Sequence, residues 1–196
     1  NYAQLGPETV MAEFIAAAKK RPGFYSYAST GIGSLNHLAM EDIKRKAGIF
    51  VLHVPYGGGG PAITAVVGNT ASLTLLSYAA LRGQIQADKL KALAVTGAQR
   101  LPELPNTPTV AESGYPGFEA YSWIGAFAPA NTPAAVVKKL TADFQAVLND
   151  PEIKSKLTQG GFDVQASDGP AVERYAKREF ERWQQFVKNT KLNLED

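Results

Sequence analysis

Apolar residues in the first half of the chain follow two alternating spacings. Residues 7–20 carry them every three or four positions, which is typical of an amphipathic helix. Residues 49–54 form a continuous β-branched apolar run, which predicts a strand buried on both faces. Together the patterns predict strands at 24–28, 49–54, 72–76 and 91–96, and helices at 7–20, 61–67, 78–87 and between Ser34 and Gly48. This strand–helix alternation predicts an α/β fold with a parallel sheet covered on both sides.

The composition changes at Gly97, where the second half of the chain begins. Residues 97–120 are rich in proline and show little periodicity, so we expect a long irregular connection. The remaining apolar spacing predicts strands at 121–128 and 162–165, and helices from Thr132 as N-cap to Val147, from Pro151 to Gly160 and over 169–190.

Composition excludes several classes of function. The 196 residues include no cysteine, which rules out disulfides, thiolate metal sites and cysteine nucleophiles. The net charge of +2 and the absence of a basic run make nucleic acid an unexpected partner. No apolar stretch approaches the ~20 residues that span a bilayer. The sequence starts in a polar turn at Asn1, so the leader of an exported protein would lie outside it.

The most informative stretch is YSYASTGIGSLNHL (25–38), which reads as a strand, a Gly-rich turn and a helix start. Backbone N–H groups converge on an anion at such a corner, and the helix dipole favours the negative charge. An ordinary strand-to-helix turn is the alternative. A dinucleotide fingerprint is excluded because Asn36 stands where its third glycine would be. The candidate ligand-binding residues of this first turn are Ser29, Thr30, Gly31, Gly33 and Ser34.

A second Gly-rich turn follows the next expected strand, in VPYGGGGPA (54–62). Consecutive glycines carry a high conformational entropy cost, so we expect the backbone to lie close to a ligand there. A flexible surface loop is the alternative, and a P-loop is excluded because no Lys-Ser/Thr pair follows. Both turns are expected at the carboxyl edge of the sheet, facing one small carboxylate. The candidates of this second turn are Tyr56, Gly57, Gly58, Gly59, Gly60 and Pro61.

Catalytic and metal chemistry have weaker support. A small α/β esterase or acyltransferase using Ser34 or Ser29 with His37 is the enzymatic alternative. No G-x-S-x-G elbow accompanies that pairing. The two histidines, His37 and His53, have no carboxylate at ligand spacing, so no metal and no other cofactor is expected. His53 is expected to be a satisfied core or lobe-edge histidine, and His37 to stabilise a helix turn.

Four stretches carry a family resemblance: YASTGIGSLNHLA (27–39), HVPYGGGGPA (53–62), KLKALAVTGAQRLPELPNTPTVAESGYPGFEAYSWIGAFAPANTP (89–133) and the amphipathic C-terminal helix near Trp183. In order and spacing, the chain resembles the substrate-binding proteins of tripartite tricarboxylate transporters, the Bug or TctC family. The resemblance implies a type II periplasmic-binding-protein fold, with two α/β lobes around a cleft. It makes 1–96 ligand-binding lobe two, 97–120 the inter-lobe connection, and 121–196 the returning part of an incomplete lobe one.

The resemblance also implies a function. Such a protein captures a small carboxylate in the periplasm and delivers it to membrane transporter subunits, with no chemistry performed on it. In that family, helix N-termini and Gly-rich loops hold the carboxylate, partly through ordered waters. Those positions fall on the two turns described above. The residues of these turns predict an anion site without the resemblance.

Two departures from the family pattern affect this expectation. The family chain normally starts with a further segment that is missing here, and a half-built lobe would expose sheet edge and apolar surface. A homodimer that covers the incomplete lobe is therefore one hypothesis, and a fragment that has lost ligand binding is another. The family often has Asp near the position of Ser72 and Lys near that of Gly57. Ser72 is a further candidate ligand-binding residue, and the presence of Ser72 and Gly57 alters the expected ligand preference.

Overall fold

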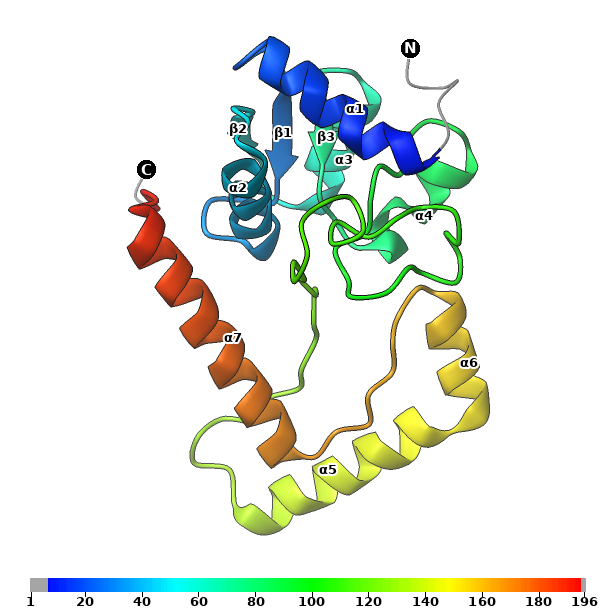
Figure 1. Cartoon of the computed structure of the whole chain (residues 1–196). Helices are drawn as coiled ribbons and strands as arrows, with labels where there is room; N and C mark the ends of the chain where they lie inside the picture. The colour runs from blue at the N-terminus through cyan, green and yellow to red at the C-terminus, as the bar shows by residue number, and fades with distance from the viewer. Residues whose placement is uncertain (1–6, 195–196) are drawn as a thin grey trace. The chain divides into compact units, whose positions relative to one another are not determined.

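The computed structural model describes residues 7–194 of the chain (Figure 1). Residues 1–6 and 195–196, which include the expected polar turn at Asn1, lie outside the described residues. The chain divides into two compact units, Asn1–Ser122 and Trp123–Asp196. Assignment of these units to the two lobes of a binding protein stays a prediction.

Three short parallel strands form the sheet of the first unit. They are β1 (Ser26–Ser29), β2 (Leu52–Pro55) and β3 (Leu73–Thr74), in the order β2-β1-β3. In this register Tyr27 lies opposite both His53 and Leu73. Because the strands are parallel, their carboxyl ends and the turns that follow them meet at one edge of the sheet.

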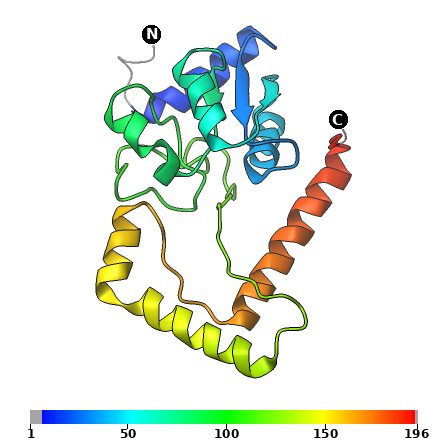
Figure 2. The ribbon, with the colours of Figure 1, turned by 180° about the vertical axis from the view of Figure 1, so that it is seen from behind.

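Helices cover both faces of this sheet (Figures 1 and 2). The helices of the first unit are α1 (Pro7–Lys20), α2 (Leu35–Ala47), α3 (Gly59–Val67) and α4 (Tyr78–Gln86). The chain moves from β1 to β2 in one direction and from β2 to β3 in the other, so right-handed crossovers place α2 and α3 on opposite faces. The contacts agree: Tyr27 donates a hydrogen bond to Glu41 of α2, while Ala28 packs against Ala62 and Ala65 of α3.

The expected helices of the first unit are present, and their caps explain their bounds. The α1 helix spans 7–20 as predicted, and it buries Val10, Phe14 and Ala18 on one side. Ser34 is the N-cap of α2, and Gly48 ends that helix in the left-handed conformation at φ 61. Glycine adopts this conformation without the steric penalty of a Cβ.

Three expected strands are wrong. Within the described residues no strand forms at 91–96, 121–128 or 162–165, and the first of these stretches contributes one isolated bridge between Val95 and Thr109. A strand needs a neighbour that satisfies its backbone N–H and C=O groups. The apolar spacing of a segment does not reveal whether such a neighbour exists.

The expectation that 49–54 is a strand buried on both faces is also wrong. Strand β2 lies at the edge of the sheet, and the side chains of Phe50 and Leu52 are 56% and 51% exposed. Val51, which lies between Phe50 and Leu52 in the sequence, is fully buried. The apolar β-branched run therefore predicted that a strand forms here, but it did not predict that the strand lies at the edge of the sheet.

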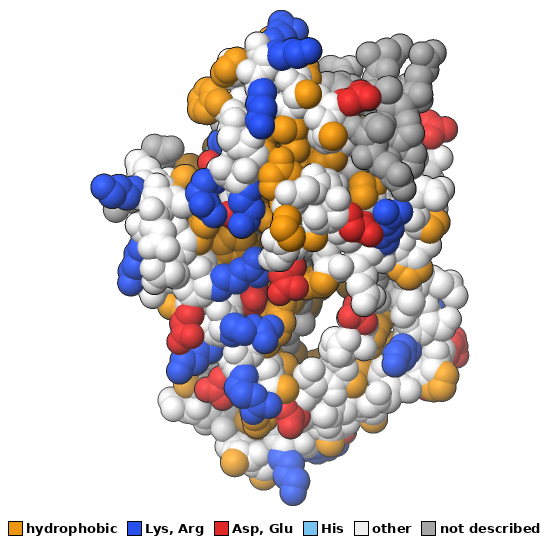
Figure 3. All heavy atoms as spheres, viewed as in Figure 1, with side chains coloured by type: hydrophobic (Ala, Val, Ile, Leu, Met, Phe, Trp, Pro, Cys, Tyr) orange, Lys and Arg blue, Asp and Glu red, His pale blue; other side chains and the backbone are white. Residues whose placement is uncertain are grey.

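The second unit is helical. It contains α5 (Ala134–Asn149), α6 (Pro151–Gln159) and α7 (Gly169–Thr190). Pro133, rather than the expected Thr132, is the N-cap of α5, whereas the side chains of Asp150 and Asp168 cap α6 and α7. Acidic and basic side chains are interspersed along α7 (Figure 3). None of the helices in the described part of the chain is long and apolar enough to cross a membrane.

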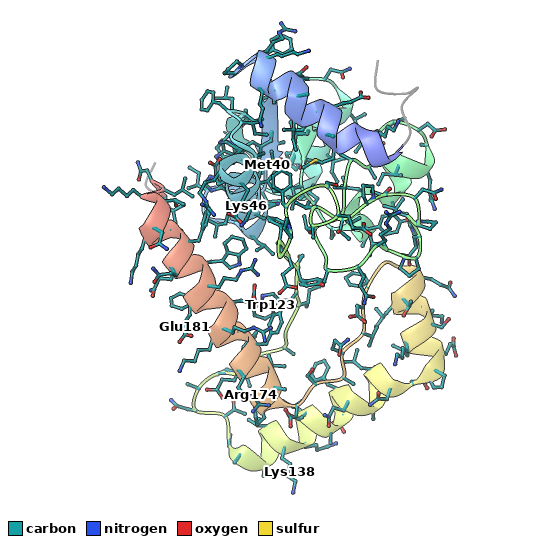
Figure 4. All side chains as sticks on the ribbon, viewed as in Figure 1. Met40, Lys46, Trp123, Lys138, Arg174 and Glu181 are labelled. Atoms are coloured by element: carbon teal, nitrogen blue, oxygen red, sulfur yellow. The ribbon has the colours of Figure 1, made fainter. Side chains whose placement is uncertain are left out.

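Large apolar side chains of this unit remain exposed. Trp123, labelled in Figure 4, packs edge-on against Tyr175 of α7 with ring centroids 5.7 Å apart. By contrast, Ile124 is 84% exposed and Phe127 is 70% exposed. On α5, the exposed apolar residues are Val136, Val137, Leu140, Phe144 and Val147. These spacings place them on one side of that helix.

The burial pattern predicts where the stability of the first unit comes from. Ile43 of α2 is 4% exposed, so Ile43→Ala should lower the free energy of unfolding by about 2–5 kcal/mol through lost burial and a cavity. The matched change Ile124→Ala, at an exposed position, should stay within about 0.5 kcal/mol. Urea denaturation followed by circular dichroism measures both, and equal losses for the two variants would contradict the assigned core.

Candidate functional site

The two Gly-rich turns lie side by side at the carboxyl edge of the sheet. Strands β1 and β2 pair with Ser29 opposite Pro55, so each turn leaves its strand at the same level. The amide of Tyr56 donates to the carbonyl of Ser29 at 3.0 Å, and a Cβ placed on Gly31 would lie 3.9 Å from the Tyr56 carbonyl oxygen. The expected common corner is therefore present in the structure.

Several amides of the first turn already have protein acceptors. The amide of Gly31 donates to Ser29 Oγ at 3.1 Å, and that of Ser34 donates to the Gly31 carbonyl at 3.3 Å. The amide of Gly33 donates to Nδ1 of His37 at 3.0 Å. The turn therefore uses three of its own amides to fix its shape, and these three are not free for a ligand.

The remaining donors of the first turn are two amides. Within the described residues, the N–H groups of Ile32 and Leu35 have no hydrogen-bond acceptor. The hydroxyl of Ser34 donates to the Gly31 carbonyl at 2.6 Å and contacts Asn36 Oδ1. The hydroxyl of Thr30 donates to the same Asn36 oxygen at 3.2 Å. Both hydroxyls thus shape the turn, and both residues remain partly accessible.

Ser29 has a different position from the other candidates of the first turn. Its side chain is completely buried, and Oγ lies 2.6 Å from Nε2 of His53. A side chain with no exposed surface cannot contact a ligand in the turn unless it moves. Ser29 therefore supports the turn from within the protein.

The second turn offers four consecutive unused donors. Among the described residues, the amides of Gly57, Gly58, Gly59 and Gly60 have no acceptor, and Gly58, the N-cap of α3, has no side chain with which to cap them. A Cβ placed on any of the four would have no neighbouring atom within 4 Å. Only Gly58, at φ 140, has a backbone conformation that requires glycine. At the other three, neither conformation nor protein packing requires glycine.

The neighbours of this glycine run complete the second turn. Tyr56 is partly buried and packs against the small core of Ala28, Ala62 and Ala65. Pro61 lies exposed in the first turn of α3, where its missing N–H costs no helix hydrogen bond. Both residues therefore sit at the corner as the sequence predicted.

A third helix start, which the sequence reasoning missed, follows β3. Ser77 is the N-cap of α4 and makes no side-chain capping bond. Because β3 is parallel to β1, this helix also begins on the carboxyl side of the sheet. The signal was available, since a serine stands between the expected strand at 72–76 and the expected helix at 78–87.

Ser72 is the candidate that the structure does not bring to this edge. It lies just before β3 and exchanges hydrogen bonds with Ser26, at the amino end of β1. A strand the length of β1 separates that end from the Gly-rich turns by roughly 10 Å. The structure therefore assigns Ser72 to strand pairing.

The geometry does not form the enzymatic pair considered from the sequence. Ser34 Oγ accepts a hydrogen bond from the backbone N–H of His37 at 3.4 Å, and the ring Nδ1 of His37 accepts from Gly33 instead. The serine–histidine contact that exists joins Ser29 to His53, and it is buried at the serine. Among residues 7–194, no group of three potential ligands gathers to hold a metal ion.

Burial keeps both histidines neutral near pH 7. Burial lowers the pKa of His37, with the nearby Glu41 carboxylate opposing the shift and the Lys44 ammonium adding to it. Burial, and then the neighbouring His37, lower the pKa of His53 to about 4. The positive charge near the corner therefore comes from helix N-termini rather than from imidazolium.

Comparison with known proteins identifies the family to which the chain belongs. Residues 4–192 match the model of the tripartite tricarboxylate transporter family receptors. A relative from Pseudomonas sp. (strain P51), the UPF0065 protein in the tcbD-tcbE intergenic region, is 36% identical over 93% of this chain and 55% of its own length. The chain thus spans about half the length of this relative.

Solved structures agree with the expected fold class. The R. palustris protein Rpa4515 with adipate has 32% identity and a TM-score of 0.87, over 90% of this chain and 59% of that one. The periplasmic binding protein BugD has 34% identity and a TM-score of 0.81, over 91% of this chain and 60% of that one. The expected periplasmic-binding-protein-like α/β fold is confirmed.

The glycine geometry generates a test of the second turn. Gly58→Ala forces a side chain into a conformation reserved for glycine and should lower the free energy of unfolding by about 1–3 kcal/mol. Gly57→Ala, beside it and with the same open space, should leave stability unchanged or raise it by about 0.4–1 kcal/mol. Equal denaturation midpoints for the two variants would contradict the assigned backbone.

Proposed function

Because the chain belongs to the tripartite tricarboxylate transporter receptor family, we propose that it captures a small carboxylate at the corner formed by its two Gly-rich turns. The family and its solved neighbours are substrate-binding proteins, not enzymes, which decides against the esterase alternative. The adipate in the Rpa4515 structure supports a small organic acid as the ligand class.

The observation that carries this proposal is the run of unused donors at Gly57–Gly60. These four adjacent amides have no protein acceptor, and a Cβ at any of the four glycines would meet no atom within 4 Å. An ionised carboxylate has acceptors and no donors, so it matches this surface. The N-terminus of α3 adds about 0.3–1 kcal/mol from its dipole, and up to ~2 kcal/mol where the site is partly buried.

In this proposal the first turn supplies the second side of the site. The unused amides of Ile32 and Leu35 complete the donor set, with the hydroxyls of Thr30 and Ser34 within the same turn. The buried contacts of Ser29, and the amides of Gly31 and Gly33, hold that turn in shape.

The proposed setting is the periplasm, with delivery of the carboxylate to the membrane subunits of a transporter. The family description as a transporter receptor supports the partner, and the periplasmic binding protein BugD supports the compartment.

A glycine substitution tests the carboxylate site separately from folding. Gly60 lies in the first turn of α3, so Gly60→Ala should raise stability by about 0.5–1 kcal/mol while its methyl group obstructs the ligand. Gly83→Ala in α4, also with open space, is the matched control, with the same gain and unchanged binding. Thermal-shift and calorimetric titrations with adipate, succinate and citrate measure both.

The expected result for the unmodified chain is a raised melting temperature. A ligand present at 100 times its Kd adds about 2.7 kcal/mol of stability. A flat response to every carboxylate would favour the alternative of a chain that keeps the fold and has lost binding. Equal binding by Gly60→Ala and Gly83→Ala would contradict the location of the site.

We also propose that a second copy of the chain covers the exposed apolar side of α5. Light scattering should then show a dimer, and Leu140→Asp should shift it to monomer because Leu140 belongs to that side. Lys138→Asp is the control, since Lys138 projects away from α5 in Figure 4. A monodisperse monomer of the unmodified chain would contradict the proposal.

A further inference from the structure

The two histidines of the chain lie against each other beside the first turn. The rings of His37 on α2 and His53 on β2 are nearly parallel, with centroids 4.0 Å apart. The ring of Tyr27 on β1 stacks against the ring of His53, with 4.8 Å between their centroids. Three consecutive elements of the chain, β1, α2 and β2, thus each contribute one ring to a single cluster.

Each histidine holds one glycine of the first turn. Nδ1 of His37 accepts the amide of Gly33 at 3.0 Å. Nε2 of His53 contacts Ser29 Oγ, which in turn accepts the amide of Gly31. Both glycines have positive φ, 132 at Gly31 and 73 at Gly33. The imidazoles therefore fix the turn at the two residues whose backbone conformation is least common.

The contact to Gly33 requires the neutral ring. A nitrogen that accepts a hydrogen bond carries no proton, so His37 bears its proton on Nε2. The groups that face the ring cluster are the Glu41 carboxylate and the Lys44 ammonium of α2 and the Tyr27 hydroxyl of β1. Glu41 accepts hydrogen bonds from both Tyr27 and Lys44, so its charge is already partly compensated.

We propose that His37 is the positioning residue of the first turn, and that its protonation releases Gly33 and weakens carboxylate binding in acid. This inference rests on the proposed function, since a change in the turn alters affinity only if the turn binds the carboxylate. When Nδ1 takes a proton from solvent, two N–H groups face each other and the contact to Gly33 becomes repulsive. A charged His37 would also lie 4.0 Å from the ring of His53.

The direction of the pH effect follows from burial. In the unfolded chain both histidines take up a proton near pH 6.5, whereas burial lowers their pKa in the folded protein, to about 4 for His53. The unfolded state therefore binds more protons between those values, and stability falls as the pH falls through this window. Because burial also lowers the pKa of His37, the release of the turn is expected below pH 6.5.

Two variants separate the hydrogen bond from the ring. His37→Asn keeps an acceptor oxygen near the position of Nδ1 but cannot titrate, and His37→Phe keeps an aromatic ring without an acceptor. At pH 7.5, His37→Phe should bind adipate about 2- to 10-fold more weakly than the unmodified chain, and His37→Asn should bind nearly as well. Circular dichroism at each pH confirms that the proteins compared are folded.

The pH profile distinguishes positioning from a merely structural role. Between pH 7.5 and 4.5, the affinity of the unmodified chain for adipate should fall about 2- to 10-fold relative to His37→Asn. The titration of adipate itself is common to both proteins and cancels in this ratio. Parallel profiles for the two proteins, or unweakened binding by His37→Phe at pH 7.5, would overturn the proposal.

Amide exchange at Gly33 provides a measurement that needs no ligand. The Gly33 amide should be protected in the unmodified chain and in His37→Asn, and it should exchange faster in His37→Phe and in acid once the intrinsic exchange rate is corrected for. If none of these proteins binds adipate, succinate or citrate at pH 7.5, the proposed function fails, and this exchange experiment still decides the positioning role. Equal protection in all three proteins would overturn it.

Discussion

The parallel pairing of β1 with β2 is the constraint on which the candidate site depends. Its register places the ends of both strands at one level, so the two turns that follow are held together. The hydrogen bond from Tyr56 to Ser29 extends the ladder by one residue into those turns. A slip of one residue would displace one turn along the other and reverse the faces of Tyr27 and Ala28.

The two turns have different internal chemistry at the same edge. In the first turn, three amides donate to acceptors of the protein, namely Ser29 Oγ, Nδ1 of His37 and the Gly31 carbonyl, so few of its donors remain free. The second leaves its amides unused over the run Gly57–Gly60. We infer that the first turn sets the geometry of the corner and the second supplies most of the charge-assisted hydrogen bonds.

Sequence reasoning predicted the helices and the position of both turns because these depend on local signals. Periodicity, Ser34 as a cap and Gly48 as an end determine α2 within a few residues. The wrong strands at 91–96, 121–128 and 162–165 required partners that no local pattern reports. The contact of Ser29 with His53, 24 residues away, decided that Ser29 is a support, and only the strand register shows it.

The most direct test of the shared corner is a backbone amide NMR titration of the chain with adipate. Chemical-shift changes should saturate together at Gly57–Gly60 and at Ile32 and Leu35, with no change at Ser72. Changes confined to one turn, or centred on Ser72 at the opposite edge, would contradict it.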